Sequence, residues 1–349
     1  MITLRTPLFL LLALSLTGCL PSACNRTESR ALFPADSLSR ELAAELPVDT
    51  LRVAGTLATP DLVHPRTVGF AADGTLWMTD TGTGSVYRVE SGEKNAAGVG
   101  APGERVLREL RRRTDTFPYL AGFAADTALV FEPSSHTMWR IAPDGDTVDV
   151  ALGGRLPERG GLRYAAANDS VWAIKIAADE FDSYLARLDP RTGEAVESVG
   201  LTGEAWRHAG LLRVEGDTIR SLSAYLPQMH LWAGALDSLR LAGFDSPMLA
   251  RTRQFVQGDT HEPPMLSASA AFQPRGIHVL NMRPGWLRID IYDRAGHLQY
   301  ILTQPDPGFN KNYYPTDLAV REYPDGRVEY AVSVLEPTPR VDFFTWQYP

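Results

Sequence analysis

The sequence predicts an all-β fold assembled from repeated four-stranded antiparallel units, and three observations lead to this prediction. The segment Gly69–Asp73 recurs letter for letter at Gly122–Asp126, with a looser copy at Arg163–Asp169. A β-rich run follows each copy, and turn residues separate the runs within each unit. Because one such unit cannot bury its apolar face alone, the repeat predicts an array of units packed on their neighbours.

The spacing of the repeat indicates which array it forms. The first apolar residue after each recurring turn follows the previous one at intervals of 53, 42, 48, 58 and 51 residues. These residues are Leu76, Leu129, Val171, Ile219, Ile277 and Val328. Solenoid repeats of about 20–35 residues are too short, whereas units of roughly 40–50 residues with several strands are typical of β-propeller blades. Six units therefore predict a six-bladed β-propeller.

Each unit shows the pattern of four strands. A β-rich run such as Thr75–Met78 is followed by a run such as Val86–Val89, in which apolar and polar residues alternate with the period of a strand. Pro143–Gly145 and Asp189–Gly193 are turn sequences suited to tight hairpins. A more polar run, such as Thr147–Val150, closes the unit.

The last unit has one strand fewer than the others. Its three runs are Asp317–Val320, Val328–Val332 and Val341–Trp346, whereas Asp49–Gly55 is an unassigned strand ahead of the first unit. An unpaired strand edge invites unwanted pairing. We therefore expect the N-terminal strand to close the propeller as the outermost strand of the last blade.

Two helices are expected beside the strands. Leucines spaced by four in residues 36–46, behind an Asp or Ser cap, predict a short N-terminal amphipathic helix. In the fourth unit, Ser246 at the N-cap and Pro247 at the first helical position predict an inserted helix that continues to Val256.

The first 18 residues have the pattern of a secretory signal peptide. Arg5 precedes an apolar run at residues 8–16, which is too short to span a hydrocarbon core of ~30 Å as a helix. Leu16–Cys19 then resembles the bacterial lipoprotein signal, which implies cleavage before Cys19 and lipidation of that cysteine. The alternative is an ordinary secreted protein in which Cys19 is an incidental thiol.

The lipoprotein resemblance implies a location and a domain organisation. Several acyl chains on Cys19 would anchor the protein firmly to the lipid bilayer of the cell envelope. Leu20, directly after the lipidated cysteine, implies the outer membrane by the same resemblance. We expect a signal peptide at 1–18, a membrane tether and short helix at 19–47, and the propeller at 48–349.

Composition excludes several classes of function. The 349 residues include 34 Lys and Arg and 42 Asp and Glu, a net charge of −8, which argues against nucleic acid as a partner. The two cysteines cannot form a disulfide framework or a four-cysteine zinc site. The sequence also contains neither a Gly-rich phosphate loop nor the G-x-S-x-G motif of α/β-hydrolases.

The segment Thr67–Val89 resembles an NHL-type propeller blade, a pattern shared with the gluconolactonase family and with streptogramin-lyase-like propellers. Since this architecture hosts enzymes, binders and scaffolds, the resemblance implies a fold rather than an activity. The gluconolactonase pattern implies a metal-binding glutamate on a first strand, where this chain has Arg66–Val68. The lyase pattern implies a His and a Glu near the axis; His64 and Glu132 are of these types, but no motif joins them.

The resemblance also implies that the loops entering the first strand and joining the second to the third surround one mouth of the central channel. The candidate ligand-binding residues in these loops are Arg66, Asp80, Glu132, Lys175, Arg207, Tyr225, Arg283 and Tyr314. The same loops carry His64, Tyr119, His136, His208, His230, Asn281, Tyr313 and Glu336. Guanidinium groups suit carboxylate or phosphate recognition, and tyrosines offer flat surfaces to sugars or peptides. The alternative is that these loops are polar because they are exposed, with Asp80 bracing its own turn.

The sequence favours a non-catalytic lipoprotein whose channel mouth binds a glycan, a peptide or a protein without a cofactor. The alternative is a metal-dependent propeller hydrolase or lyase of the gluconolactonase type, with a divalent metal in the channel. The missing glutamate and the lack of a clustered set of carboxylates favour the binding protein.

Overall fold

The computed structural model describes residues 44–91, 105–153, 162–177, 183–283, 285–308 and 312–349. The predicted signal peptide, Cys19 and the tether lie outside the described residues, as does almost all of the helix expected at 36–46. Among the residues described, no helix is both long enough and apolar enough to cross a membrane.

The described chain is almost entirely β-structure, arranged as antiparallel groups of four consecutive strands. The first group is β3 (Pro65–Phe70), β4 (Leu76–Asp80), β5 (Ser85–Ser91) and β6 (Arg105–Arg112). The next is β7 (Tyr119–Ala124), β8 (Thr127–Glu132), β9 (Thr137–Ile141) and β10 (Thr147–Ala151). It is followed by β11 (Leu162–Ala167), β12 (Trp172–Ala177), β13 (Ser183–Leu188) and β14 (Ala195–Leu201).

The second half of the chain repeats this order. After the 3₁₀ helix η1 (Ala205–Arg207) come β15 (Leu212–Glu215), β16 (Thr218–Leu222), β17 (Gln228–Trp232) and β18 (Leu236–Arg240). Helix α3 (Leu249–Val256) precedes β19 (Ser267–Gln273), β20 (Gly276–Arg283), β21 (Trp286–Tyr292) and β22 (Leu298–Thr303). The last strands are β23 (Tyr314–Glu322), β24 (Arg327–Glu336) and β25 (Arg340–Gln347).

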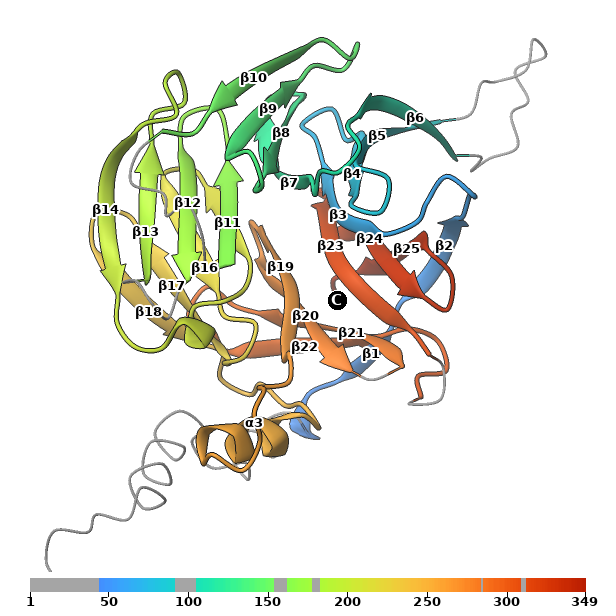
Figure 1. The fold of residues 1–349 in the computed structure, drawn as a ribbon. Helices are drawn as coiled ribbons and strands as arrows, with labels where there is room; N and C mark the ends of the chain where they lie inside the picture. Colours follow the sequence, from blue (N-terminus) through green and yellow to red (C-terminus); the bar gives the residue numbers. More distant parts are fainter. Residues whose placement is uncertain (1–43, 92–104, 154–161, 178–182, 284, 309–311) are drawn as a thin grey trace, which may run out of the picture.

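The groups are arranged around a common centre, with β3, β7, β11, β19 and β23 facing inward (Figure 1). Apolar side chains fill the space between neighbouring sheets; in one cluster, Val68 and Met78 pack with Phe343 of the last sheet. The all-β prediction is therefore confirmed, and the arrangement is that of a β-propeller.

The recurring glycine of the repeat has a steric role at the centre. Gly122 has φ +151°, and a Cβ at this position would lie 1.9 Å from the carbonyl oxygen of Ala167 in the neighbouring strand β11. Only a glycine permits this approach. Gly122 and Ala167 also form the parallel pair that joins β7–β10 and β11–β14 into one eight-stranded sheet.

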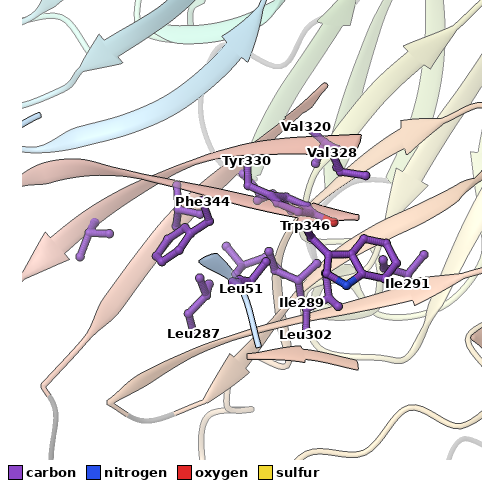
Figure 2. Close-up of a cluster of buried hydrophobic side chains, with 14 of the residues drawn as sticks. Leu51, Leu287, Ile289, Ile291, Leu302, Val320, Val328, Tyr330, Phe344 and Trp346 are labelled. Atoms are coloured by element: carbon purple, nitrogen blue, oxygen red, sulfur yellow. The ribbon is translucent and has the colours of Figure 1, made fainter. Parts of the chain in front are cut away.

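The N-terminal segment closes the fold, but it does so as two strands. The prediction of one strand at Asp49–Gly55 is wrong in its boundaries. β1 (Val48–Thr50) pairs in parallel with β22, and β2 (Arg52–Leu57) pairs antiparallel with β25 as the outermost strand of the last sheet. Leu51, between them, is buried among apolar side chains of the last two sheets (Figure 2), so the chain changes sheets at this residue.

The inserted helix is present but begins later than predicted. Helix α3 starts at Leu249, and Met248 rather than Ser246 occupies the N-cap position. The Ser246 hydroxyl accepts a hydrogen bond from the Met248 backbone N–H at 3.2 Å. Ser246 therefore stabilises the turn that leads into the helix, and the first helical residue lies beyond it.

Candidate functional site

One end of the propeller axis contains a cavity of about 250 Å³, lined by the later residues of β3, β7, β15, β19 and β23. Because the ends of these strands converge there, the strands run in the same direction. Their first residues accordingly surround the opposite end, which we call the channel mouth. The predicted site residues belong to this second end.

A buried ion pair ties the inner strands together between the two ends. The Asp317 carboxylate of β23 accepts hydrogen bonds from the Val68 backbone N–H at 2.9 Å and from the Arg213 guanidinium at 3.3 Å. The Ser269 hydroxyl donates to the same carboxylate. One side chain thus connects β3, β15, β19 and β23.

Four tyrosines and one arginine surround the channel mouth. The Arg66 guanidinium carbon lies 5.9 Å from the centroid of the Tyr119 ring. Burial, with smaller contributions from Tyr225 and Tyr119, raises the pKa of Tyr164 to about 12; a hydrogen bond with the Gly210 backbone and the charge of Arg66 oppose this rise. Burial likewise raises the pKa of Tyr225, with contributions from the charge of Glu262 and from Tyr314. These five residues, which we call the mouth ring, therefore lie close enough to influence one another electrostatically.

A lysine is buried beside the mouth ring. Lys175 of β12 is fully buried; its Nζ donates a hydrogen bond to Ser221 Oγ at 2.8 Å and lies 4.7 Å from the Tyr164 ring centroid. Burial lowers the pKa of Lys175 to about 7. Among the described residues, no carboxylate lies within ion-pair distance of its ammonium group. At neutral pH the lysine is therefore only partly charged.

Two histidines adjoin this lysine. The rings of His208, after η1, and His230 of β17 lie 5.5 Å apart between centroids. His208 Nε2 lies 3.0 Å from the carbonyl oxygen of Thr202. Burial, together with the nearby His230, Lys175 and Arg207, lowers the pKa of His208 to about 4, against the hydrogen bond to Thr202, which raises it. Burial and Lys175 also lower the pKa of His230. Both imidazoles are therefore neutral at pH 7.

Two acidic candidates are used by local turns. The buried Asp80 carboxylate accepts backbone N–H groups from Val63 and His64 on one oxygen and from Gly82 and Thr83 on the other, at 2.8–2.9 Å. Asp80 therefore braces its own turn, which is the alternative that the sequence left open.

Glu132 has the same role in the second group of strands. Its carboxylate accepts backbone N–H groups from Phe117, Ser134 and Ser135. Burial alone would raise the pKa of Glu132. The hydrogen bonds have the larger combined effect, so its pKa is lowered. The charged carboxylate is thus committed to holding two loop segments together.

Two predicted arginines have partners of their own. Arg283 is buried, and its guanidinium forms an ion pair with Asp245 at 3.1 Å, anchoring the segment that leads to α3. Arg207 lies 3.5 Å from the Glu204 carboxylate and 5.5 Å from the Trp206 ring centroid. The structure therefore brings Arg66, Lys175, Tyr225 and Tyr314 together and gives Asp80, Glu132 and Arg283 structural contacts, with Arg207 at the edge of the histidine pair.

The site also contains residues outside the predicted set. Tyr119, His208 and His230 lie in the predicted mouth loops, whereas Tyr164 and Ser221 lie in strands β11 and β16 and are not among the candidates. The sequence signal for Tyr164 is its position in the looser third copy of the repeat. In the part of the chain that the structure describes, no group of three His, Cys, Asp or Glu side chains is placed to hold a metal ion.

Comparisons with known proteins indicate the fold alone. No family model and no curated protein matches the sequence. Similar solved structures include U3-55K, with 9% identity over 84% of this chain and 98% of that chain and a TM-score of 0.51. The WD40 β-propeller domain of Doa1 has 10% identity over 84% and 96% of the chains, with a TM-score of 0.45. A catalytically inactive virginiamycin B lyase from Staphylococcus aureus, with quinupristin, has 10% identity over 83% and 87%, with a TM-score of 0.48.

The arrangement of four-stranded sheets about one axis defines the class of the protein as an all-β propeller. At about a tenth identity, the likenesses add nothing about activity, because this architecture carries unrelated functions.

Proposed function

We propose that this chain is a lipid-anchored lipoprotein of the cell envelope whose propeller binds a glycan, peptide or protein at the channel mouth without catalysis. The observation that carries this proposal is the mouth ring. Arg66 of β3, Tyr119 of β7, Tyr164 of β11, Tyr225 between β16 and β17, and Tyr314 of β23 come from different four-stranded groups and bring four tyrosines and one guanidinium together. A few oriented polar groups among apolar surfaces are typical of ligand sites.

We infer that the propeller has six blades of the NHL type. The eight-stranded sheet counts as two blades, since only the pair of Gly122 and Ala167 joins its halves. The other four-stranded groups count as one blade each, with β1 added to the edge of the fifth. This count agrees with six repeats at intervals of 42–58 residues.

The contacts of the acidic residues favour binding over catalysis. A gluconolactonase-like enzyme needs carboxylates that can hold a metal or move a proton. Asp80 and Glu132 instead direct their oxygens at backbone N–H groups. The metal-dependent hydrolase or lyase therefore remains the second candidate, and no contact among the described residues supports it.

Replacing Arg66 with Ala tests the binding function. We expect a roughly ten- to hundredfold loss of affinity, because one charge-assisted contact contributes about 1.5–3 kcal/mol. The melting temperature should change little, since Arg66 is only half-buried and has no ion pair among the described residues. The measurement is binding to panels of envelope glycans, peptides and lactones, with product analysis in parallel.

The matched control for this test is Arg191→Ala, in an exposed turn between β13 and β14. It removes the same charge without touching the mouth ring. Metal-dependent turnover of any lactone would support the enzyme instead. Binding that is unchanged in Arg66→Ala would place the ligand outside the mouth ring.

The lipid anchor is tested separately. Replacement of Cys19 with Ala should abolish incorporation of labelled palmitate and prevent cleavage of the signal peptide, because the thiol is the attachment point for the diacylglycerol. Cys24→Ala is the matched control and should be lipidated normally. Palmitate incorporation that persists in Cys19→Ala would contradict the lipoprotein assignment.

A further inference from the structure

Beside the mouth ring lies a cluster of basic side chains that has no counter-ion among the described residues. We call Lys175, His208 and His230 the basic pocket. Lys175 is fully buried and His208 is 3% exposed. Burying basic groups side by side is costly unless an opposite charge joins them. Buried bases with strongly shifted pKa values are candidates for a functional site.

The ring nitrogens of the two histidines determine which hydrogen bonds this pocket can offer to a ligand. The Thr202 carbonyl can only accept a hydrogen bond, so His208 Nε2 carries the ring hydrogen and donates to it. In the neutral ring, Nδ1 is then a bare lone pair. His208 Nδ1 and His230 Nε2 are both buried and have no hydrogen-bond partner within the described structure. Protonation turns such a nitrogen into a donor for an oxygen atom of a ligand.

The charged groups that shift the pKa values of His208 and His230 are all basic. Arg207 of η1, Lys175 of β12 and His230 of β17 each lower the pKa of His208. Tyr164 of β11 presents its ring to Lys175, and its pKa is raised by burial. Ser221 of β16 accepts the hydrogen bond from the lysine. A negative ligand group would therefore meet the donors of Lys175 and His208, while the carboxylates nearby are Glu204, which pairs with Arg207 at 3.5 Å, and Glu262, which raises the pKa of Tyr225.

We propose that the basic pocket binds an oxyanion group, either a carboxylate or a tetrahedral phosphoryl or sulfate group, and that binding is coupled to uptake of protons by Lys175 and His208. This proposal rests on the proposed function, because the oxyanion would be one end of the ligand held by the mouth ring. The Lys175 ammonium and the protonated His208 Nδ1 donate to its oxygens, and the tyrosines contact the remainder of the ligand.

The coupling has a definite sign. An anion in the pocket favours the charged forms of the bases and raises their pKa, so the complex binds more protons than the free protein. Affinity therefore rises as the pH falls. Lys175 has a pKa of about 7 in the free protein. Because the charged fraction of Lys175 falls about tenfold between pH 6 and pH 8, the anion should bind at least about tenfold more weakly at pH 8 than at pH 6, and the proton taken up by His208 adds to this loss.

The experiment titrates the full chain with sulfate, whose charge is constant over this range, and records the melting temperature and the histidine side-chain NMR signals at pH 6 and pH 8. We expect a sulfate-dependent rise in the melting temperature at pH 6, a shift of the His208 signals, and binding at least about tenfold weaker at pH 8. Acetate and methyl phosphate, titrated in parallel, distinguish a planar carboxylate from a tetrahedral group.

Variants separate this proposal from the proposed function. Lys175→Met and His208→Gln should lose the sulfate response, whereas Arg191→Ala should keep it. Arg66→Ala should keep the sulfate response while it loses capture of the larger ligand. A sulfate response that is equal at pH 6 and pH 8, or that survives in Lys175→Met, would overturn the proposal. Sulfate binding without any ligand at the mouth ring would support the pocket and contradict the proposed function.

Discussion

Deletion of residues 48–57 is expected to leave a protein that aggregates or melts at least about 10 °C lower than the full chain. The deletion removes β1 and β2 and exposes the hydrogen-bonding edge of β25. It also removes Leu51 and Leu57, which are 1% and 8% exposed. Each buried leucine contributes about 1.5–3 kcal/mol, a large part of a typical stability of about 5–15 kcal/mol.

Point variants keep this prediction measurable if the deleted protein is insoluble. Figure 2 shows Leu51 among Leu287, Ile289 and Phe344, so Leu51→Ala leaves a cavity between two sheets. We expect a loss of about 2–5 kcal/mol in urea unfolding. Val53→Ala, at a position 63% exposed in β2, is the control and should change stability by less than about 0.5 kcal/mol. A deleted protein that melts like the full chain would show that the N-terminal strands do not hold the ring closed.

Much of the fold was predictable because its determinants are local in sequence. The glycine of the repeat is required by a contact at the centre, as Gly122 shows with Ala167. Alternating residues and turn sequences define the strands of each unit, since both depend on near neighbours along the chain. The split between β1 and β2 was not predictable in this way. It depends on Leu51 entering a space between two sheets, where its apolar neighbours run from Leu280 to Trp346, far along the chain.

The candidate site was predictable only in part. Residue type marks Asp80 and Glu132 as chemical candidates, but their carboxylates are used by the backbone of adjacent turns. Whether a carboxylate faces a turn or a channel depends on rotamers and loop paths that the sequence pattern does not specify. Lys175 has a clearer signal, because it stands between Ile174 and Ile176 in a strand that is otherwise apolar. Its partner Ser221 lies 46 residues away, and only the packing of two blades brings the two together.

Replacement of Lys175 with Met is the substitution for which we expect a gain in stability. Burial lowers the pKa of Lys175 from 10.5 to about 7, so the unfolded chain binds its proton more tightly than the folded protein does. Folding is therefore opposed at low pH, by about 1.4 kcal/mol for each unit of the difference. This cost is fully present below pH 7 and disappears as the pH rises through 10.5.

Methionine has a similar length and no charge, so Lys175→Met should stabilise the protein at pH 6 by several kcal/mol, less about 1 kcal/mol for the lost hydrogen bond to Ser221. The measurement is urea unfolding at pH 6 and pH 10, with Arg191→Met as a control that should match the parent at both values. The gain should be largest at pH 6 and shrink toward pH 10. A variant that is less stable than the parent at pH 6 would mean that favourable contacts hold the charged lysine. Sites built for binding commonly reduce stability. If Lys175→Met gains stability at pH 6 and also loses the sulfate response, Lys175 destabilises the free protein and is kept for ligand binding.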